Sequence, residues 1–311
     1  MPVTNYPYKI SVAICTYNRA RFITKALDSL SNQNFDKNNF EVVVVDNNST
    51  DNTQELLKTY QKDHPSLNFR FVTETNQGVA YTRTRGAMEA KGEIVAYLDD
   101  DCMAESNWLN EITKFYASHH EAMSTGGRII PLYLTPIPKW FGKYFWGLVG
   151  NYDQGKKVFQ MQGVRYPSGA NMHFRKTAFE KYGYFDGDLG RSGKSLMAGE
   201  EKAMYLKLIN ANEKVYYLPH VIVHHHVEEN KFDKEYVKRH SMGIGASERL
   251  MNKGSFVKLS IKFFEYLAKL GFAIAYGFLY LLQGQLSKMS MLAKFRWWVI
   301  EGFINPEKTK G

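Results

Sequence analysis

The longest run of carboxylates in the sequence is Asp99-Asp100-Asp101, which directly follows the apolar run at residues 93–98. That run has the length and composition of a buried strand, so three carboxylates would emerge together at its end. Such a cluster repels itself unless a cation lies beside it. Hard divalent cations such as Mg²⁺ and Mn²⁺ take oxygen ligands and keep positions open for phosphate oxygens, so the cluster predicts a metal–phosphate site. A solvated acidic turn or a helix cap is the alternative.

Strand and helix patterns that would position this cluster alternate along the N-terminal third of the chain. Apolar runs typical of buried strands lie at residues 9–15, 40–45, 69–73 and 93–98. Helical patterns lie at about residues 20–32, 51–63 and 79–90, and residues 107–120 and 123–130 predict a further helix and a further strand. Because the runs are apolar throughout, they predict a mostly parallel sheet flanked by helices on both faces.

Polar residues follow each predicted strand. Residues 16–19 (TYNR) come after the first run, Asp46 closes the second, and residues 76–78 (NQG) follow the third. In parallel sheets, ligands bind outside the carboxyl ends of the strands, so we expect these residues and the acidic cluster to share a pocket. The sequence has neither a GxGxxG fingerprint nor a GxxxxGK[ST] loop, so a nucleotide would be held by acidic side chains and a metal.

Composition limits the class of protein. The 311 residues are 44% hydrophobic, enough for a full core, and the net charge of +9 favours an anionic partner such as nucleotide phosphate, nucleic acid or an anionic membrane. The two cysteines, Cys15 and Cys102, form neither a CxxC pair nor a disulfide framework, which indicates a reducing compartment. Residues 1–9 carry no apolar signal-peptide segment, so we expect no export by that route.

Taken together, the motifs resemble the GT-A nucleotide-sugar domain of the family 2 glycosyltransferases. The resemblance is carried by residues 17–19, residues 45–51, Asn76-x-Gly78-x-x-x-Thr82-Arg83-x-x-Gly86 and residues 98–101, in that order. Residues 169–171 (GAN) and 183–186 (GYFD) are similar to the family's acceptor-side motifs. The resemblance implies an α/β fold of GT-A type, a single domain with a mostly parallel sheet, plus a C-terminal helical extension.

For the sugar donor, the resemblance implies a role for several of these residues. Asp46 would contact the uracil or ribose, with Thr16 and Arg19 lining the base pocket. Arg83 would face the donor phosphates or sugar, unless it lies on a helix surface paired with Glu89. The remaining donor-side residues would be Asn76, Asp99 and Asp100.

The resemblance also implies a divalent metal, Mn²⁺ or Mg²⁺, that bridges the donor diphosphate and binds Asp101. Residues 215–227 predict two short strands around Pro219, ending in His224-His225-His226. The triplet by itself is a weak metal signal, because adjacent residues of a strand point to opposite faces. Family members carry a histidine that aligns with His225, so we expect it to complete the metal site and its two neighbours to be ordinary polar or packing residues.

Glu200 and Glu201 open a predicted helix that reaches about residue 210. The family usually has Glu-Asp here, and its second acid is the general base, a role that passes to Glu201, with Glu200 orienting the acceptor or the base. A sugar hydroxyl has a pKa far above 7, so a carboxylate within hydrogen-bond reach must take its proton. A second acid beside the first raises the pKa of one of them. Two surface acids that favour the helix dipole are the alternative.

We expect a catalytic domain over residues 1–230, with a nucleotide-binding half at 1–105 and an acceptor half at 106–230, and a helical extension over 231–311. Residues 131–167 predict a lid, an acceptor-facing loop or a membrane-touching loop, unless the aromatic cluster at 140–146 packs on a core. Residues 270–282 are uncharged but too short to span a membrane, and a basic, Trp-bearing segment follows. This favours an interface helix, with a hairpin packed on the catalytic domain or on a second subunit of a homo-oligomer as the alternative.

The resemblance implies a metal-dependent, inverting glycosyltransferase. It would move a sugar from a UDP-type donor to a hydroxyl of a glycan or lipid-linked acceptor, in surface polysaccharide or glycoconjugate synthesis. It would act in the cytoplasm or peripherally on the cytoplasmic face of the membrane. The alternatives are a catalytically impaired nucleotide-sugar or glycan-binding protein of the same fold, and a nucleotidyltransferase, whose Gly-rich basic loop the sequence lacks. Nucleic-acid binding suits the charge, but no recognisable module supports it.

Overall fold

The computed structural model describes residues 6–193 and 195–309. Residues 1–5, part of the stretch examined for a signal peptide, lie outside the described residues. The chain divides into two compact units. The first comprises Met1–Leu132, Gly150–Asp186 and Glu201–His226, and the second comprises Tyr133–Val149, Gly187–Glu200 and Val227–Gly311.

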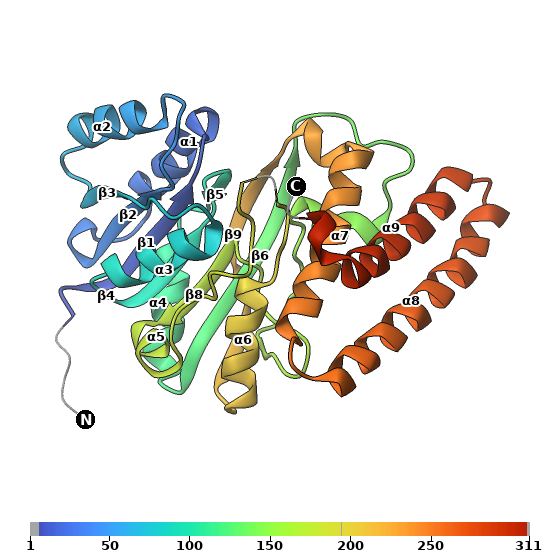
Figure 1. Ribbon diagram of the computed structural model, residues 1–311. Coiled ribbons are helices and arrows are strands. Elements are labelled where there is room, and N and C mark those ends of the chain that lie inside the picture. The colour runs from blue at the N-terminus through green and yellow to red at the C-terminus, as the bar shows by residue number, and fades with distance from the viewer. Residues whose placement is uncertain (1–5, 194, 310–311) are drawn as a thin grey trace. The chain divides into compact units, whose positions relative to one another are not determined.

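The first unit is built on a nine-stranded sheet in the order β3-β2-β1-β4-β8-β6-β9-β5 (Figure 1). The ninth strand, β7, pairs with β9. The strands are β1 (Tyr8–Thr16), β2 (Phe40–Asp46), β3 (Phe69–Thr73), β4 (Gly92–Leu98), β5 (Cys102–Ala104), β6 (Ala122–Tyr133), β7 (Phe159–Gln160), β8 (Asn171–Arg175) and β9 (Lys214–Val227). The helices beside them are α1 (Ala20–Ser31), α2 (Thr53–Asp63), α3 (Val79–Glu89), α4 (Trp108–Ser118), α5 (Lys176–Tyr182) and α6 (Glu200–Asn210).

The four N-terminal strands pair in parallel, which brings their carboxyl ends to one edge. β1 lies between β2 and β4, and β2 lies beside β3. The register places Thr16 opposite Asp46, and Asp46 opposite Thr73. β8 joins β4 antiparallel, and β5 joins β9 antiparallel. The common edge expected from the sequence is therefore present.

Side chains of the central strands alternate between the two faces of the sheet, and a hydrophobic core lies on each face. Ile10, Val12 and Ile14 of β1 pack in a core that includes residues of α1, α2 and α4. Ala13, between them, points to the other face, where residues of α3, α5 and α6 complete a second core. Strands buried on both faces must be apolar throughout, which explains the pattern of their sequences.

One predicted element differs from the structure. Residues 214–227 form the single strand β9, so the prediction of two short strands around Pro219 was wrong. β9 pairs with β7 at Tyr216 and Tyr217, and with β5 from Val223 to His225. Pro219 lies between these two paired segments, so its missing N–H interrupts neither of them.

The second unit is mainly helical, with α7 (Lys234–Met251), α8 (Phe256–Leu282) and α9 (Leu286–Ile304), and the short 3₁₀ helices Lys143–Val149, Glu229–Phe232 and Pro306–Thr309. α7 and α9 approach closely, since a Cβ on Gly245 would lie 2.0 Å from the Val299 carbonyl oxygen. Of the aromatic cluster at 140–146, three side chains, Trp140, Phe141 and Phe145, are buried in the core of this unit, whereas Trp146 is 43% exposed.

Candidate active site

The acidic turn at residues 99–101 lies at the carboxyl edge of the parallel strands. It follows β4 and leads directly into β5, and the Cys102 N–H donates to the Asp99 carbonyl at 3.0 Å. Asp100 and Asp101 are buried, whereas the Asp99 side chain is 39% exposed. Because a strand follows the turn and α4 begins only at Trp108, these carboxylates do not cap a helix.

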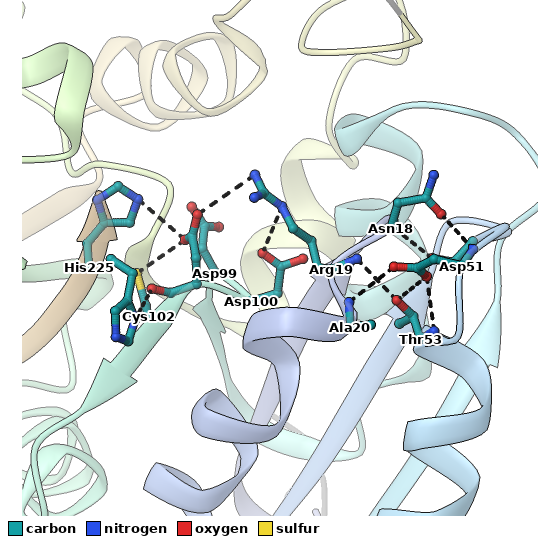
Figure 2. A network of polar contacts seen from close by, with 12 residues as sticks. Asn18, Arg19, Ala20, Asp51, Thr53, Asp99, Asp100, Cys102 and His225 are labelled. Carbon is teal, nitrogen blue, oxygen red and sulfur yellow. Dashed lines mark hydrogen bonds and ion pairs between the residues drawn. The ribbon is translucent and has the colours of Figure 1, made fainter. Parts of the chain in front are cut away.

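Two buried carboxylates side by side require compensating charge. Arg19 Nε lies 3.8 Å from Asp100 Oδ1 (Figure 2). Arg19 Nη2 lies 3.9 Å from Asp101 Oδ2. Burial and the neighbouring Asp101 charge raise the pKa of Asp100 well above its ordinary value, and Arg19 offsets this only in part. A further cation at the turn would therefore stabilise the ionised pair.

Asp101 has a second neighbour, His225 on β9. Figure 2 shows the His225 imidazole directed toward the acidic turn, and its Nε2 lies 3.4 Å from Asp101 Oδ1. Ligand atoms of Asp101, Cys102 and His225 all lie within 4.8 Å of one another. Burial and the nearby carboxylates raise the pKa of the Cys102 thiol, so it keeps its proton. The carboxylate suits either Mn²⁺ or Mg²⁺, and the imidazole favours Mn²⁺, a transition metal, over Mg²⁺. The residues present therefore fit a divalent metal held by Asp101 and His225.

Strand geometry separates His225 from the other two histidines of the triplet. Successive side chains of β9 point to opposite faces of the sheet. His224 Nε2 lies 3.1 Å from the Glu105 carboxylate, and the His226 ring packs 5.6 Å from the Phe22 ring. Of the three, His225 is the one beside the Asp101 carboxylate.

Arg83 connects the acidic turn with the start of α6. The residue is 5% exposed; its Nη2 lies 3.4 Å from Asp99 Oδ1, and its Nη1 lies 3.9 Å from Glu201 Oε2. Glu89, the partner considered for a surface arginine, pairs instead with Arg70 at 2.7 Å. The interpretation of Arg83 as a helix-surface residue was therefore wrong, and its guanidinium lies between two carboxylates of the candidate site.

The two acids at the start of α6 have different surroundings. Glu200 is buried, and its carboxylate accepts a hydrogen bond from the Gly199 N–H at 3.1 Å. It thus satisfies a backbone donor at the helix N-terminus. Glu201 has a side chain that is 22% exposed and lies beside Arg83. Of the pair, Glu201 is the more exposed carboxylate, and it lies beside the Arg83 guanidinium.

Two glycines leave space for the side chains of Arg83 and His225. A Cβ on Gly169 would lie 2.4 Å from Arg83 Nη2, and a Cβ on Gly150 would lie 2.7 Å from His225 Nδ1. Gly150 also has a φ of +72°, a conformation that L residues rarely adopt. Gly169 belongs to one of the motifs noted in the sequence, whereas nothing in the sequence pattern pointed to Gly150.

The loops after β1 and β2 are joined by a polar network beside the acidic turn (Figure 2). The Asp51 carboxylate accepts hydrogen bonds from the N–H groups of Ala20 at 3.3 Å and Thr53 at 3.0 Å, so it serves the first turns of both α1 and α2. Burial acts to raise the pKa of Asp51, but hydrogen bonds from Thr53 outweigh it and hold that pKa below its ordinary value. The Arg19 N–H donates to Thr53 Oγ1 at 3.1 Å, so the network also fixes the backbone from which the Arg19 side chain extends.

Asp46 closes β2 and is fully buried. Its carboxylate accepts hydrogen bonds from the Ser49 N–H at 3.2 Å and from Gln54 Nε2 at 2.6 Å. Thr16, also buried, lies opposite it in the parallel register. Asp46 therefore holds the shape of the loop after β2, in addition to any contact it makes with a donor.

Asn76 is not brought into this group of residues. It is exposed, and its side chain donates to the Glu74 carboxylate at 2.8 Å. The buried Asn47 connects the loops after β2 and β3 instead. Its Nδ2 donates to the carbonyls of Glu74 and Asn76, and its Oδ1 accepts from the Gly78 N–H at 2.8 Å. This role of Asn47 was not predicted, and the signal in the sequence was its position directly after Asp46, the last residue of a buried strand.

Comparisons with known proteins agree with this architecture. A family model described as glycosyl transferase family 2 matches residues 11–183. The glucosyl-dolichyl phosphate glucuronosyltransferase of Haloferax volcanii is 28% identical over 249 residues, which is 78% of this chain and 77% of that protein.

Solved structures are similar over nearly the whole chain. A mannosyltransferase from Pyrobaculum calidifontis in complex with GDP-Man and Mn²⁺ has a TM-score of 0.67 at 18% identity, over 99% of this chain and 89% of that one. Residues 1–349 of S. aureus TarS in complex with UDP have a TM-score of 0.55 at 20% identity, over 96% of this chain and 92% of that one. The expected α/β fold of GT-A type is confirmed.

Proposed function

Since this chain belongs to glycosyl transferase family 2, we propose that it transfers a sugar from a nucleoside diphosphate donor to a hydroxyl of a lipid-linked acceptor. One observation carries the proposal: the acidic turn has two charged partners. Asp101 lies beside His225, which forms a pair suited to a metal, and Asp99 lies beside the buried Arg83, which also contacts Glu201. The similarity to a glucosyl-dolichyl phosphate glucuronosyltransferase supports a lipid-linked acceptor.

The donor would lie along the carboxyl edge of the parallel strands. Its base would meet the loops after β1 and β2, where Thr16, Arg19 and Asp46 lie. We propose uracil as the base, from the motif resemblance; similar folds hold UDP in one case and GDP-Man in another. Displacement of a fluorescent nucleotide by UDP but not by GDP would support this choice, and the reverse order would refute it.

Asp101 and His225 would hold a divalent metal, which when bound neutralises charge on the leaving diphosphate. Arg19 already contacts Asp100 and Asp101, so its guanidinium is placed to contribute positive charge at the same end of the donor. Asp99, the exposed member of the turn, would meet the ribose or the sugar.

In the transfer step, the acceptor hydroxyl oxygen forms a bond to the anomeric carbon from the side opposite the leaving group. The bond from that carbon to the diphosphate breaks, and its electron pair stays on the phosphate oxygen. Glu201 takes the hydroxyl proton as the new bond forms. Arg83, at 3.9 Å from Glu201, orients the carboxylate. A single displacement of this kind inverts the anomeric configuration.

We also propose that the reaction occurs at the cytoplasmic face of a membrane. Both Cys15 and Cys102 are free thiols, which suits a reducing compartment, and a lipid-linked acceptor would be met at a membrane.

The purified chain, incubated with Mn²⁺, a UDP-sugar and a short-chain lipid-phosphate-linked sugar, tests the proposal. We expect acceptor-dependent release of UDP, an inverted anomeric centre in the product by NMR, and loss of activity with EDTA. Donor binding without any turnover would favour the binding-protein alternative. The absence of both donor binding and turnover would refute the proposed function.

A further inference from the structure

One side of α8 is apolar and exposed to solvent. The helix has 27 residues, about 40 Å in length at 1.5 Å per residue. Large side chains at helical spacing along this side are each between 51% and 83% exposed; they form what we call the outer α8 face: Val257, Ile261, Phe264, Phe272, Leu279 and Leu282. The stripe continues through positions 268, 271 and 275, which are alanine, glycine and alanine, so it carries no charge.

The opposite side of α8 is packed within its own unit. Tyr266, Ala273 and Gly277 are buried, and a Cβ on Gly277 would lie 3.0 Å from the Met289 side chain at the start of α9. Only this side of the helix thus packs into the hydrophobic core of the second unit. Large contiguous apolar surfaces of this kind are uncommon on soluble monomers and mark an interaction site.

The charge of this region indicates what would cover the face. Residues 231–311 contain 14 Lys and Arg against 6 Asp and Glu, so they hold +8 of the chain's net +9. Lys258 and Lys269 of α8 are exposed, as are Lys294 and Trp297 of α9. Exposed apolar side chains with basic and Trp neighbours suit the interface of a bilayer that carries anionic lipid.

We propose that the outer α8 face lies in the plane of an anionic membrane surface, with its apolar side chains among the acyl chains and the neighbouring lysines at the phosphate headgroups. A second copy of the chain is less suited to cover this face, because dimerisation would bring two strongly basic surfaces together. Anionic lipid supplies the complementary charge.

The helix is placed along the membrane rather than across it. Among the residues that the structure describes, α8 is the one helix long and apolar enough to cross a membrane by length and composition. Its first half, however, carries Lys258, Lys262, Glu265 and Lys269. The uncharged remainder, residues 270–282, is about 20 Å long at 1.5 Å per residue, shorter than a hydrocarbon core of about 30 Å.

Vesicle co-sedimentation of the full chain tests this inference. We expect binding to phosphatidylcholine vesicles that contain phosphatidylglycerol, and weaker binding to phosphatidylcholine alone. The double variant Phe264→Gln/Leu279→Gln should lower the partition coefficient about 100-fold, roughly tenfold for each apolar side chain. Lys258→Gln/Lys294→Gln should lower binding to the anionic vesicles only, by about fivefold for each lysine.

A matched control removes an exposed apolar side chain from the first unit. Met88→Gln changes a side chain that is 54% exposed, and should leave vesicle binding unchanged. Thermal shift by donor and Mn²⁺ without vesicles should be the same in all variants, so this test and the test of the transfer reaction can fail separately.

Three results would overturn the inference. The first is equal vesicle binding by the wild type and by Phe264→Gln/Leu279→Gln. The second is a wild-type dimer that the same variant dissociates, without vesicle binding by either, since the face would then be a self-interface. The third is retention in membranes after alkaline carbonate, which would indicate a spanning helix.

Discussion

Residues 1–230 bury several charged side chains, whereas residues 231–311 expose large apolar ones. The first segment is nearly neutral, with 26 Lys and Arg against 25 Asp and Glu, and several of its charged groups are buried: Arg83, Asp100 and Asp101. The second segment is strongly basic, and it exposes large apolar side chains along α8.

Both arrangements oppose stability, for different reasons. A buried charge loses its hydration and persists only when it is paired, as Arg83 is with Asp99 and Glu201. An exposed apolar stripe orders water that burial would release. The difference indicates that one segment is arranged to bind a small charged ligand and the other to meet a surface. Variants can therefore separate chemistry from surface binding.

The largest effect is expected at Asp101. Asp101→Asn removes the carboxylate proposed to hold the metal, and should lower transfer about 10³-fold or more, because charge on the leaving diphosphate is then not neutralised. Nucleotide release with a soluble acceptor measures this effect. Vesicle binding should not change, and full turnover by the variant would contradict the assignment.

Glu201→Gln should lower kcat by about 10²- to 10⁴-fold, since the acceptor proton has no base to receive it. Donor affinity, measured by nucleotide displacement, should stay close to that of the wild type. Glu201→Asp keeps the carboxylate on a shorter side chain and should recover part of the rate. A variant with unchanged kcat would remove Glu201 from the reaction.

Gly169→Ala tests the position of Arg83 without changing any charge. The added Cβ would lie 2.4 Å from Arg83 Nη2, so the guanidinium must move from between its two carboxylates. We expect a loss of transfer of about 10- to 100-fold, the scale of a 1 Å misplacement. Gly147→Ala is the control, because nothing lies within 4 Å of a Cβ there. Equal rates for the two variants would show that the placement of Arg83 does not matter.

A further prediction concerns stability rather than transfer, and a buried histidine in each segment contributes to it. Burial lowers the pKa of His173 from 6.5 to about 3, so the folded protein keeps this ring neutral while the unfolded chain binds a proton below pH 6.5. Stability should therefore fall as the pH falls from about 6.5 toward 3, by about 1.4 kcal/mol per pH unit for this proton. Burial, with the charges of Arg191 and Lys231, likewise lowers the pKa of His240 to about 3 in the second segment.

Urea unfolding across this pH range measures the linkage. His173→Gln is expected to reduce the pH slope by about one proton, even if it also lowers the overall stability through the lost partner of Thr125. His120→Gln changes an exposed histidine and provides the control. An unchanged slope in His173→Gln would contradict the buried neutral state.

Much of the fold could be predicted, because strands buried on both faces leave a direct mark on the sequence. β3 has the predicted ends, β2 and β4 are each one residue longer than predicted at one end, and β1 is one residue longer at both ends. β9 was mispredicted, since Pro219 normally interrupts a strand and only the pairing partners decide whether its missing N–H matters. The grouping of residues 133–149 with the C-terminal helices in the second unit could not be foreseen either, because packed aromatic rings join them to residues far along the chain.

The sequence by itself determined which residues the candidate site could contain. The order of strands along the chain fixes the residue types that follow each strand, including the acidic turn, and the sequence also supplies the Glu200-Glu201 pair. Only the tertiary structure decided which side chains meet. It set His225 rather than its neighbours beside Asp101, and it placed Arg83 against Gly169 and Glu201. It also made Asn47 the residue that connects the loops after β2 and β3. These contacts join residues far apart in the chain, so they depend on strand register and backbone approach, which local sequence patterns do not encode.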